Sequence, residues 1–230
     1  MDQHLQTYDA WIAHFDLLGF KNKIRTLPIP VLMNEVRGIV DDLRGEAEEF
    51  ADKVESLFYA DTFIFYSKSN EDRKYPGLLH AATHFMQKCL TKGVALRGAI
   101  AYGEIAVSTD KRVLLGSAFL DSHRCGEDQN WLGLILTTTA ADRLKEIGLD
   151  PASHGFAYVN IPKRESLPRR KSSDATLKAY AYTFCRGLAN FPCPLLSRIR
   201  EMQHFSPEED TIKYDHTVQF LEKHWRMFKQ

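Results

Sequence analysis

Residues 10–20 read AWIAHFDLLGF, a short apolar run that carries one carboxylate, Asp16, at its exit. The apolar run predicts a buried strand, and Gly19 just after it permits a tight turn. A carboxylate at the end of a buried strand is poorly solvated, so it needs a basic side chain or a divalent cation as partner. Backbone N–H groups in such a turn can face an anion, which suits a metal-bound phosphate. The simpler alternative is that Asp16 caps the next helix.

A second stretch, LFYADTFIFYS at residues 57–67, bears on the choice between those alternatives. Two strand-like runs there flank only Ala60 and Asp61, and this spacing predicts a tight hairpin with Asp61 at its tip. If the hairpin joins the first strand in one sheet, Asp16 and Asp61 converge. Two carboxylates repel each other unless a cation lies between them, and Mg²⁺ or Mn²⁺ prefers oxygen ligands together with substrate phosphates. The pair therefore predicts a divalent metal site.

Composition limits the classes of partner. The chain has 230 residues, enough for a full hydrophobic core, and its 30 Lys and Arg balance its 30 Asp and Glu. This balance gives no global electrostatic case for nucleic acid or for an anionic membrane. The N-terminus lacks a signal-peptide pattern, and no apolar stretch is long enough to span a bilayer. The cysteines have no C-x-x-C spacing and indicate reduced thiols in a cytoplasmic protein: Cys89, Cys125, Cys185 and Cys193.

Apolar periodicity predicts the remaining elements. Strands or apolar runs are expected over 53–58, 62–67, 94–107, 131–138, 155–161 and 177–184. Helices are expected over about twenty residues whose apolar positions span 31–43, and over 76–92, 117–129, 140–147, 195–203 and 208–228. This order predicts an α+β fold of the ferredoxin-like (split βαβ) type, an antiparallel sheet with helices on one face plus C-terminal helices. We expect one domain over residues 1–230, with a core over about 8–162 and a C-terminal strand and helical extension over 163–230.

Several short motifs, in order, resemble the class III nucleotidyl cyclases, the adenylate and guanylate cyclase family, over residues 10–140. FDLLGF at 15–20 resembles the first metal-binding motif of that family. The resemblance implies that the Asp16 carboxylate and the Leu17 carbonyl bind metal ions. YADTF resembles the hairpin that carries the second metal aspartate, here Asp61. The resemblance implies Mn²⁺ or Mg²⁺ as cofactor, two ions per site.

Two further motifs extend the resemblance. LRGAIAYGE at 96–104 resembles the family strand with paired glycines, and GSAFLDSHRCGE at 116–127 resembles the helix with a phosphate-binding arginine, Arg124. The implied catalytic set is Asp16, Asp61 and Arg124, in a head-to-tail homodimer whose aspartates and arginine come from different protomers. The predicted substrate-binding residues, on these motifs and beside them, are Phe15, Leu18, Gly19, Phe20, Leu57, Tyr59, Val113 and Arg97.

The chain departs from the family pattern at three positions. Leu120 replaces the asparagine that orients the ribose, four residues before Arg124. Leu57 and Val113 occupy the positions that read a purine, and neither side chain can hydrogen-bond a base edge. Losing such partners removes discrimination worth orders of magnitude, so ATP and GTP are disfavoured as substrates.

The bacterial pyrimidine cyclases of anti-phage systems resemble this chain more closely. The shared features are a compact catalytic domain, RGAI followed by glycine, and a C-terminal lysine-tyrosine pair, here Lys213 and Tyr214. This resemblance implies formation of 3′,5′-cyclic UMP or CMP from the ribonucleoside triphosphate, with the product acting on a separate effector protein. We favour UTP over CTP because uridylate cyclisation is the commoner activity of that branch.

Alternatives stay open for single residues and for the whole chain. Arg124 is either a phosphate ligand or a surface arginine paired with an aspartate of its own helix. Arg97 is either a ligand or a strand-edge arginine without one, and His14 is better explained as a strand residue facing a helix. Tyr59 stacks on a base or packs in the core. A polymerase-like palm needs a basic groove, which the neutral balance disfavours. A degenerate cyclase that only binds a nucleotide or dimerises is the non-enzymatic alternative.

Overall fold

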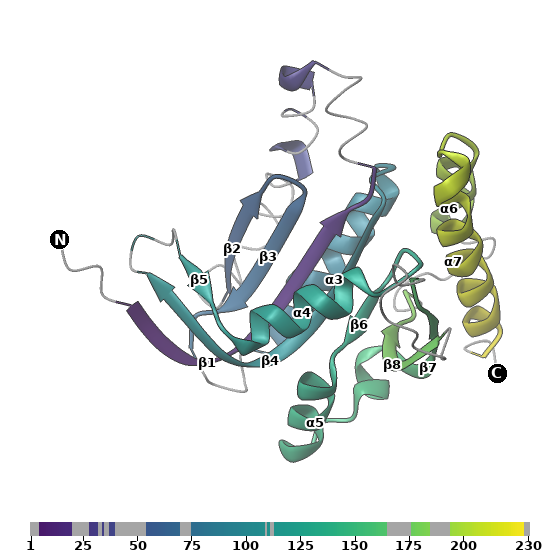
Figure 1. Ribbon diagram of the computed structural model, residues 1–230. Helices are drawn as coiled ribbons and strands as arrows, with labels where there is room; N and C mark the ends of the chain where they lie inside the picture. The colour runs from purple at the N-terminus through teal and green to yellow at the C-terminus, as the bar shows by residue number, and fades with distance from the viewer. Residues whose placement is uncertain are drawn as a thin grey trace, which may run out of the picture.

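The computed structural model describes residues 5–19, 28–31, 34, 37–39, 54–69, 75–108, 110, 113–164, 176–184 and 194–227. Eight strands form one sheet in the order β2-β3-β1-β4-β6-β8-β7, with β5 paired to β4 (Figure 1). Among the strands that the structure describes, β4 and β6 are the only parallel pair, and the other pairs are antiparallel. The strands are β1 (Leu5–Leu17), β2 (Val54–Tyr59), β3 (Thr62–Ser67), β4 (Leu96–Ser108), β5 (Leu114–Leu115), β6 (Leu134–Leu136), β7 (Phe156–Pro162) and β8 (Thr176–Tyr182).

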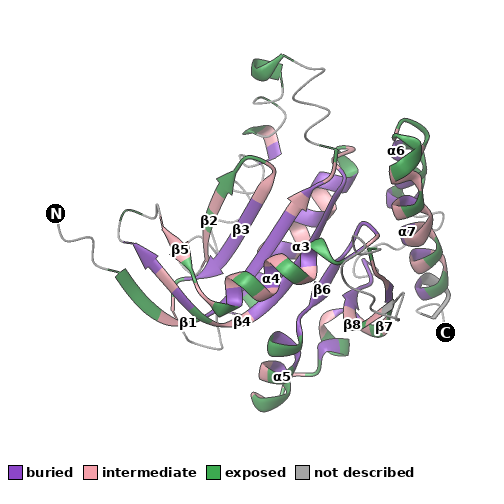
Figure 2. Ribbon diagram, viewed as in Figure 1, coloured by how far each residue is buried: buried purple, intermediate pink, exposed green. Residues whose placement is uncertain are grey.

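Strands β1 and β4 form the centre of the sheet and pair along their full length, from Leu5 opposite Ser108 to Leu17 opposite Leu96. Residues 10–15 of β1 are all buried, because the sheet is covered on both sides at this point (Figure 2). A strand buried on both faces needs apolar residues at consecutive positions rather than in alternation. This explains the unbroken run AWIAHF.

The predicted hairpin is confirmed. Strands β2 and β3 are joined by Ala60 and Asp61 alone, and Ala60 has φ +55°, a left-handed conformation typical of two-residue hairpin turns. Strand β3 pairs antiparallel with β1, so that Asp16 lies opposite Thr62. The tip of the hairpin is thereby brought beside the end of β1.

Helices cover both faces of the sheet. On one face α3 (Tyr75–Thr91) packs against Phe15 of β1, with α6 (Pro194–His204) and α7 (Glu208–Met227) completing that core. On the other face α4 (Ser117–Glu127) packs against Ile12 (Figure 1). The α+β fold class is confirmed, and α4 adds a helix to the face that was expected to be open. Because β1 is apolar on both faces, both need cover.

The C-terminal segment contributes to the sheet as well as to the helices. Strand β8 lies between β6 and β7, and α5 (Thr138–Glu146) and a short 3₁₀ helix, η2 (Pro151–His154), connect β6 to β7. Helices α6 and α7 pack against each other, and α6 packs on α3. None of the helices in the described ranges is long and apolar enough to cross a membrane.

Some expectations fall partly or wholly outside these ranges. The expected helix over 31–43 is represented only by helical residues at 29–31, 34 and 37–39. Cys89 is buried and Cys125 partly buried, and both are thiols. Cys185 and Cys193 lie outside the described residues.

Candidate active site

Asp16, near the end of β1, and Asp61, in the turn before the neighbouring strand β3, lie at the same end of the sheet. The Leu17 N–H donates to the Asp61 carbonyl oxygen over 2.8 Å. In an extended strand the N–H and C=O of one residue point the same way, so the Leu17 carbonyl also faces the hairpin tip. The two aspartates and the carbonyl that the sequence pointed to are therefore neighbours.

Five influences act on the pKa of the Asp16 carboxyl. Burial raises the pKa of its carboxyl, the charge and hydrogen bonds of Arg97 lower this pKa, and the negative charges of Asp61 and Glu127 raise it again. The net result is a raised pKa, although 22% of the side chain is still exposed. A carboxylate in this position gains more from a bound cation than an exposed one does, since desolvation and like charges both disfavour its ionised form.

Arg97 is the partner of Asp16 within the chain. It lies directly opposite Asp16 in the β1–β4 register and is only 4% exposed. Its Nε and Nη2 both donate to Asp16 Oδ2, over 3.1 and 2.9 Å. Arg97 was expected among the substrate-binding residues, but its guanidinium is buried beneath α4 and turned to Asp16. Arg97 thus lies on a central strand rather than at a sheet edge, and its carboxylate partner in the described chain is Asp16.

Arg124 and Leu120 stand on the outer face of α4. Arg124 is exposed and Leu120, one turn earlier, is 51% exposed. The helix buries its opposite face, with Ala118, Ser122 and Gly126 toward the sheet. Within the described ranges no ion pair joins Arg124 to Asp121 or Asp128. The guanidinium is therefore available to a phosphate or to a second protein chain.

Among the described residues, the predicted phosphate-binding turn has one backbone N–H group, that of Gly19, available to donate to a ligand. The Leu18 N–H is used, since it donates to the Ala95 carbonyl over 2.8 Å. Gly19 is exposed and has φ +73°, and no backbone acceptor for its N–H lies in the described part of the chain. Phe20 lies outside that part. The Phe15 side chain is fully buried against Phe85, so it supports the site from the core and does not reach a substrate.

The predicted base-reading residues differ in exposure. Leu57 is partly buried and packs on the face of the sheet that α4 covers. Val113 is partly buried, and its N–H donates to Ser108 Oγ over 2.9 Å. Tyr59 is 83% exposed beside the hairpin tip, which rules out the core-packing alternative for this ring. Its aromatic face is accessible to a ligand.

The donor set fits a hard divalent cation. Asp16 Oδ2 is held by Arg97, whereas Asp16 Oδ1 and the Asp61 carboxylate have no bonded partner among the described residues. Carboxylate and carbonyl oxygens are the ligands of Mg²⁺ and Mn²⁺, which retain waters and substrate phosphates in the remaining positions. Within the described ranges no group of three or more His, Cys, Asp or Glu side chains could hold a metal ion alone. The fit therefore depends on oxygens from the substrate.

Of two residues near Asp16, Glu127 was not recognised from the sequence, and His14 was expected only as a strand residue facing a helix. Glu127 acts on Asp16 through its charge, and it ends the same helix motif that carries Arg124. His14 faces α4, as expected, but it is 1% exposed and neither ring nitrogen has a hydrogen-bond partner among the described residues. Its ring lies 4.9 Å from that of His123. The i to i+2 spacing of His14 and Asp16 on one strand was the available signal for their shared face.

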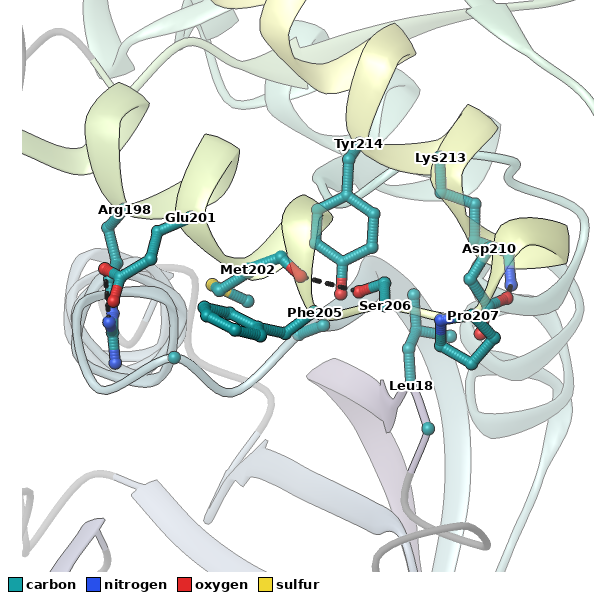
Figure 3. Close-up of a pocket in the computed structure, with 13 residues that line it drawn as sticks. Leu18, Arg198, Glu201, Met202, Phe205, Ser206, Pro207, Asp210, Lys213 and Tyr214 are labelled. Atoms are coloured by element: carbon teal, nitrogen blue, oxygen red, sulfur yellow. Dashed lines mark hydrogen bonds and ion pairs between the residues drawn. The ribbon is translucent and has the colours of Figure 1, made fainter.

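A cavity of about 380 Å³ borders the turn after β1 (Figure 3). Its other walls come from the segment before β4, from α6 and α7 and from the residues between these two helices. They include an Arg198–Glu201 ion pair at 2.5 Å and a Lys213–Asp210 ion pair. Ser206 Oγ, between the two helices, donates to the Met202 carbonyl over 2.8 Å. The C-terminal helices thus enclose one side of the predicted phosphate-binding turn.

The sequence matches no family model and no curated protein. Solved structures are nonetheless similar to this fold, including the catalytic core of a rhodopsin-guanylyl cyclase with converted specificity in complex with ATPalphaS. That comparison has a TM-score of 0.57 and 10% identity, and covers 77% of this chain and 97% of the other. The adenylyl cyclase CyaB from P. aeruginosa gives a TM-score of 0.55 at 10% identity, and the comparison covers 77% of this chain and 95% of that chain.

The guanylate cyclase domain of RhGC from Catenaria anguillulae in complex with GTP gives a TM-score of 0.56 at 10% identity, with 76% of this chain and 97% of that chain covered. The shared feature is the architecture of class III adenylyl and guanylyl cyclase catalytic domains. This chain therefore has the cyclase catalytic-domain fold.

Proposed function

We propose that this protein is a nucleotidyl cyclase that converts UTP to 3′,5′-cyclic UMP and pyrophosphate. The observation that carries the proposal is the meeting of Asp16 and Asp61 at one end of the central strands. The cyclase catalytic-domain fold supports it, because this fold is shared with proteins described as adenylyl and guanylyl cyclases.

Metal binding, phosphate binding and stabilisation of the developing charge are assigned to different residues. Asp16, Asp61 and the Leu17 carbonyl would hold two Mn²⁺ or Mg²⁺ ions. When bound, such ions activate the ribose 3′-hydroxyl and neutralise the triphosphate and the leaving pyrophosphate. Gly19 N–H donates to a phosphate oxygen, and Arg124 stabilises the charge that develops on the α-phosphate.

The exposed position of Arg124 supports a homodimer with composite sites. Arg124 and Leu120 both point away from their own sheet, and no described side chain satisfies the guanidinium. In a head-to-tail dimer Arg124 of each protomer serves the aspartates of its partner. Leu120 then supplies an apolar contact at the interface, where the related enzymes have an asparagine.

The choice of a pyrimidine nucleotide rests on the base-reading positions and on the resemblance to anti-phage pyrimidine cyclases, and UTP is preferred to CTP because uridylate cyclisation is the commoner activity of that branch. Leu57 and Val113 offer no hydrogen bond that would select a purine. Tyr59, exposed beside the hairpin tip, is available to stack on a base of either size. We extend the proposal to a second-messenger role in antiviral defence, with the product acting on a separate effector. The runner-up activities are cyclisation of CTP or of a purine nucleotide.

A non-catalytic function is the second candidate, favoured by one observation: Leu120 cannot orient a ribose as asparagine does. In that case the protein binds a nucleotide or dimerises without turnover.

Product analysis separates these candidates. The purified protein is incubated with each of the four ribonucleoside triphosphates and Mn²⁺, and the products are identified by mass spectrometry. We expect 3′,5′-cyclic UMP; cyclic CMP or a cyclic purine nucleotide would correct the substrate. A polymer or dinucleotide would support a polymerase-like activity, and no product would support the binding module.

The metal assignment is tested with Asp61→Ala. We expect turnover to disappear while the circular dichroism spectrum and the melting temperature stay near those of the unmodified protein, since Asp61 lies in a hairpin turn. Asp142→Ala is the matched control, because Asp142 is an exposed aspartate on α5. Full activity in Asp61→Ala would refute the assignment.

A further inference from the structure

Arg97 connects two parts of the molecule that the proposed function uses separately. Besides its bonds to Asp16, its Nη1 donates to the carbonyl oxygens of Glu127 and Gln129, over 2.8 and 2.6 Å. These carbonyls lie at and just beyond the C-terminal end of α4. One buried guanidinium thus bonds the candidate metal ligand on one side and the end of the Arg124 helix on the other.

The carbonyl groups at the C-terminal end of α4 bind the Arg97 guanidinium favourably. The last carbonyls of a helix lack intrahelical partners and carry partial negative charge, so a guanidinium is a favourable donor to them. Gln129 strengthens the same junction: it is fully buried and its Nε2 donates to the carbonyls of Gly98 and Cys125, over 2.9 and 2.8 Å. Trp131 Nε1 donates in turn to Gln129 Oε1 over 2.7 Å. The end of α4 is therefore tied to β4 next to Arg97.

We propose that Arg97 is a positioning residue that couples metal binding at Asp16 to the placement of α4, and through α4 to the placement of Arg124. This inference rests on the proposed function for the identity of the metal ligands. Arg97 itself is too deeply buried to touch the substrate.

The physical basis is competition for one carboxylate. Both hydrogen bonds that Arg97 donates to Asp16 fall on its Oδ2. A divalent cation on Asp16 withdraws negative charge from that oxygen and repels the guanidinium, which weakens the Arg97–Asp16 attraction. The guanidinium then bonds more strongly to the carbonyl oxygens of Glu127 and Gln129. In a homodimer Arg124 of the same α4 serves the partner, so each metal site influences the other composite site.

The test measures metal binding and helix response separately. Mn²⁺ binding to the full chain is measured by isothermal titration calorimetry in the presence of saturating 3′-deoxy-UTP, because the proposed site needs phosphate oxygens from a nucleotide. Amide hydrogen exchange of residues 117–130 is then recorded with the same nucleotide present, with and without saturating Mn²⁺, for the unmodified protein and for Arg97→Lys. Lysine keeps the positive charge but lacks the planar fork that reaches Asp16 and both carbonyls together. Arg200→Lys is the matched control, since Arg200 forms an exposed ion pair between α6 and α7.

We expect Mn²⁺ to change exchange over 117–130 in the unmodified protein and in Arg200→Lys. In Arg97→Lys we expect Mn²⁺ still to bind, with the exchange response at least halved. A merely structural role for Arg97 would lower the melting temperature and leave the Mn²⁺ response intact, and that result would overturn the coupling. Mn²⁺ binding without any exchange response in the unmodified protein would overturn it too. Absence of Mn²⁺ binding would instead refute the metal site of the proposed function, and the coupling with it.

Discussion

At the scale of single residues, Asp16 and Arg97 show what a sequence can and cannot predict. Asp16 was identifiable because a charge at the end of an apolar run demands a partner, and Asp61 because a two-residue hairpin fixes its position. The partner of Asp16 was not identifiable. Arg97 lies 81 positions along the chain, and only the β1–β4 register places it opposite Asp16. Register depends on the whole sheet, so local patterns do not reveal it.

His14 gives a prediction at this scale. Burial, and then the positive charges of His123 and Arg97, lower the pKa of His14 to about 4. Above pH ~6.5 the ring is neutral in both folded and unfolded chains. As pH falls toward 4, the unfolded chain takes up a proton that the folded protein excludes. Stability is therefore lost over this window, by about 3 kcal/mol in total.

The measurement is the free energy of unfolding by urea between pH 4 and 7, for the unmodified protein and for His14→Phe. We expect the variant to lose less stability on acidification, since phenylalanine does not titrate. His204→Gln, at an exposed position on α6, should retain the original pH dependence. An identical pH dependence in His14→Phe would contradict the role given to His14.

At the scale of elements, two glycines at the β4–α4 contact, Gly98 and Gly126, differ in the space that surrounds them. A Cβ on Gly98 would lie 2.5 Å from Phe15 Cδ1 and 2.6 Å from the His14 carbonyl oxygen. A Cβ on Gly126 would have His14 Nδ1 as its nearest neighbour, at 3.6 Å. The first position has no room for a methyl group and the second does.

We predict opposite effects for the two alanine substitutions. Gly98→Ala should destabilise the fold by about 1–3 kcal/mol through overpacking. Gly126→Ala should be neutral or stabilise by up to about 1 kcal/mol, because alanine favours a helix interior. Urea denaturation midpoints measure both effects. A tolerated Gly98→Ala would contradict the packing described between β4 and β1.

Element positions were predictable where the pattern was strong. Helix α3 and the hairpin match their expected ranges within one residue, because Gly93 and the Ala60–Asp61 pair mark sharp ends. The face covered by α4 was not predictable. Residues such as Ile12 and Ala13 are both apolar, so the sequence does not distinguish one face of β1 from the other, and cover on both faces emerges only in the assembled fold.

At the scale of the whole molecule, the exposed Arg124 makes a prediction about assembly. If Asp61 and Arg124 serve a site from different protomers, Asp61→Ala and Arg124→Ala should each be inactive alone. Mixed dimers would contain one site with both residues intact, so an equimolar mixture should recover about one quarter of the original activity. Steady-state turnover after co-refolding or subunit exchange checks this. No recovery, despite mixed dimers seen by native mass spectrometry, would place both residues in one protomer's site.

The central claim is that Asp16 and Asp61 share divalent ions. The most direct measurement is a Mn²⁺ titration by calorimetry in the presence of 3′-deoxy-UTP, which lacks the attacking hydroxyl and cannot cyclise. For the unmodified protein we predict two Mn²⁺ ions per site, and for Asp61→Asn we predict the loss of at least one ion. Equal stoichiometry and equal affinity in the two proteins would contradict the claim.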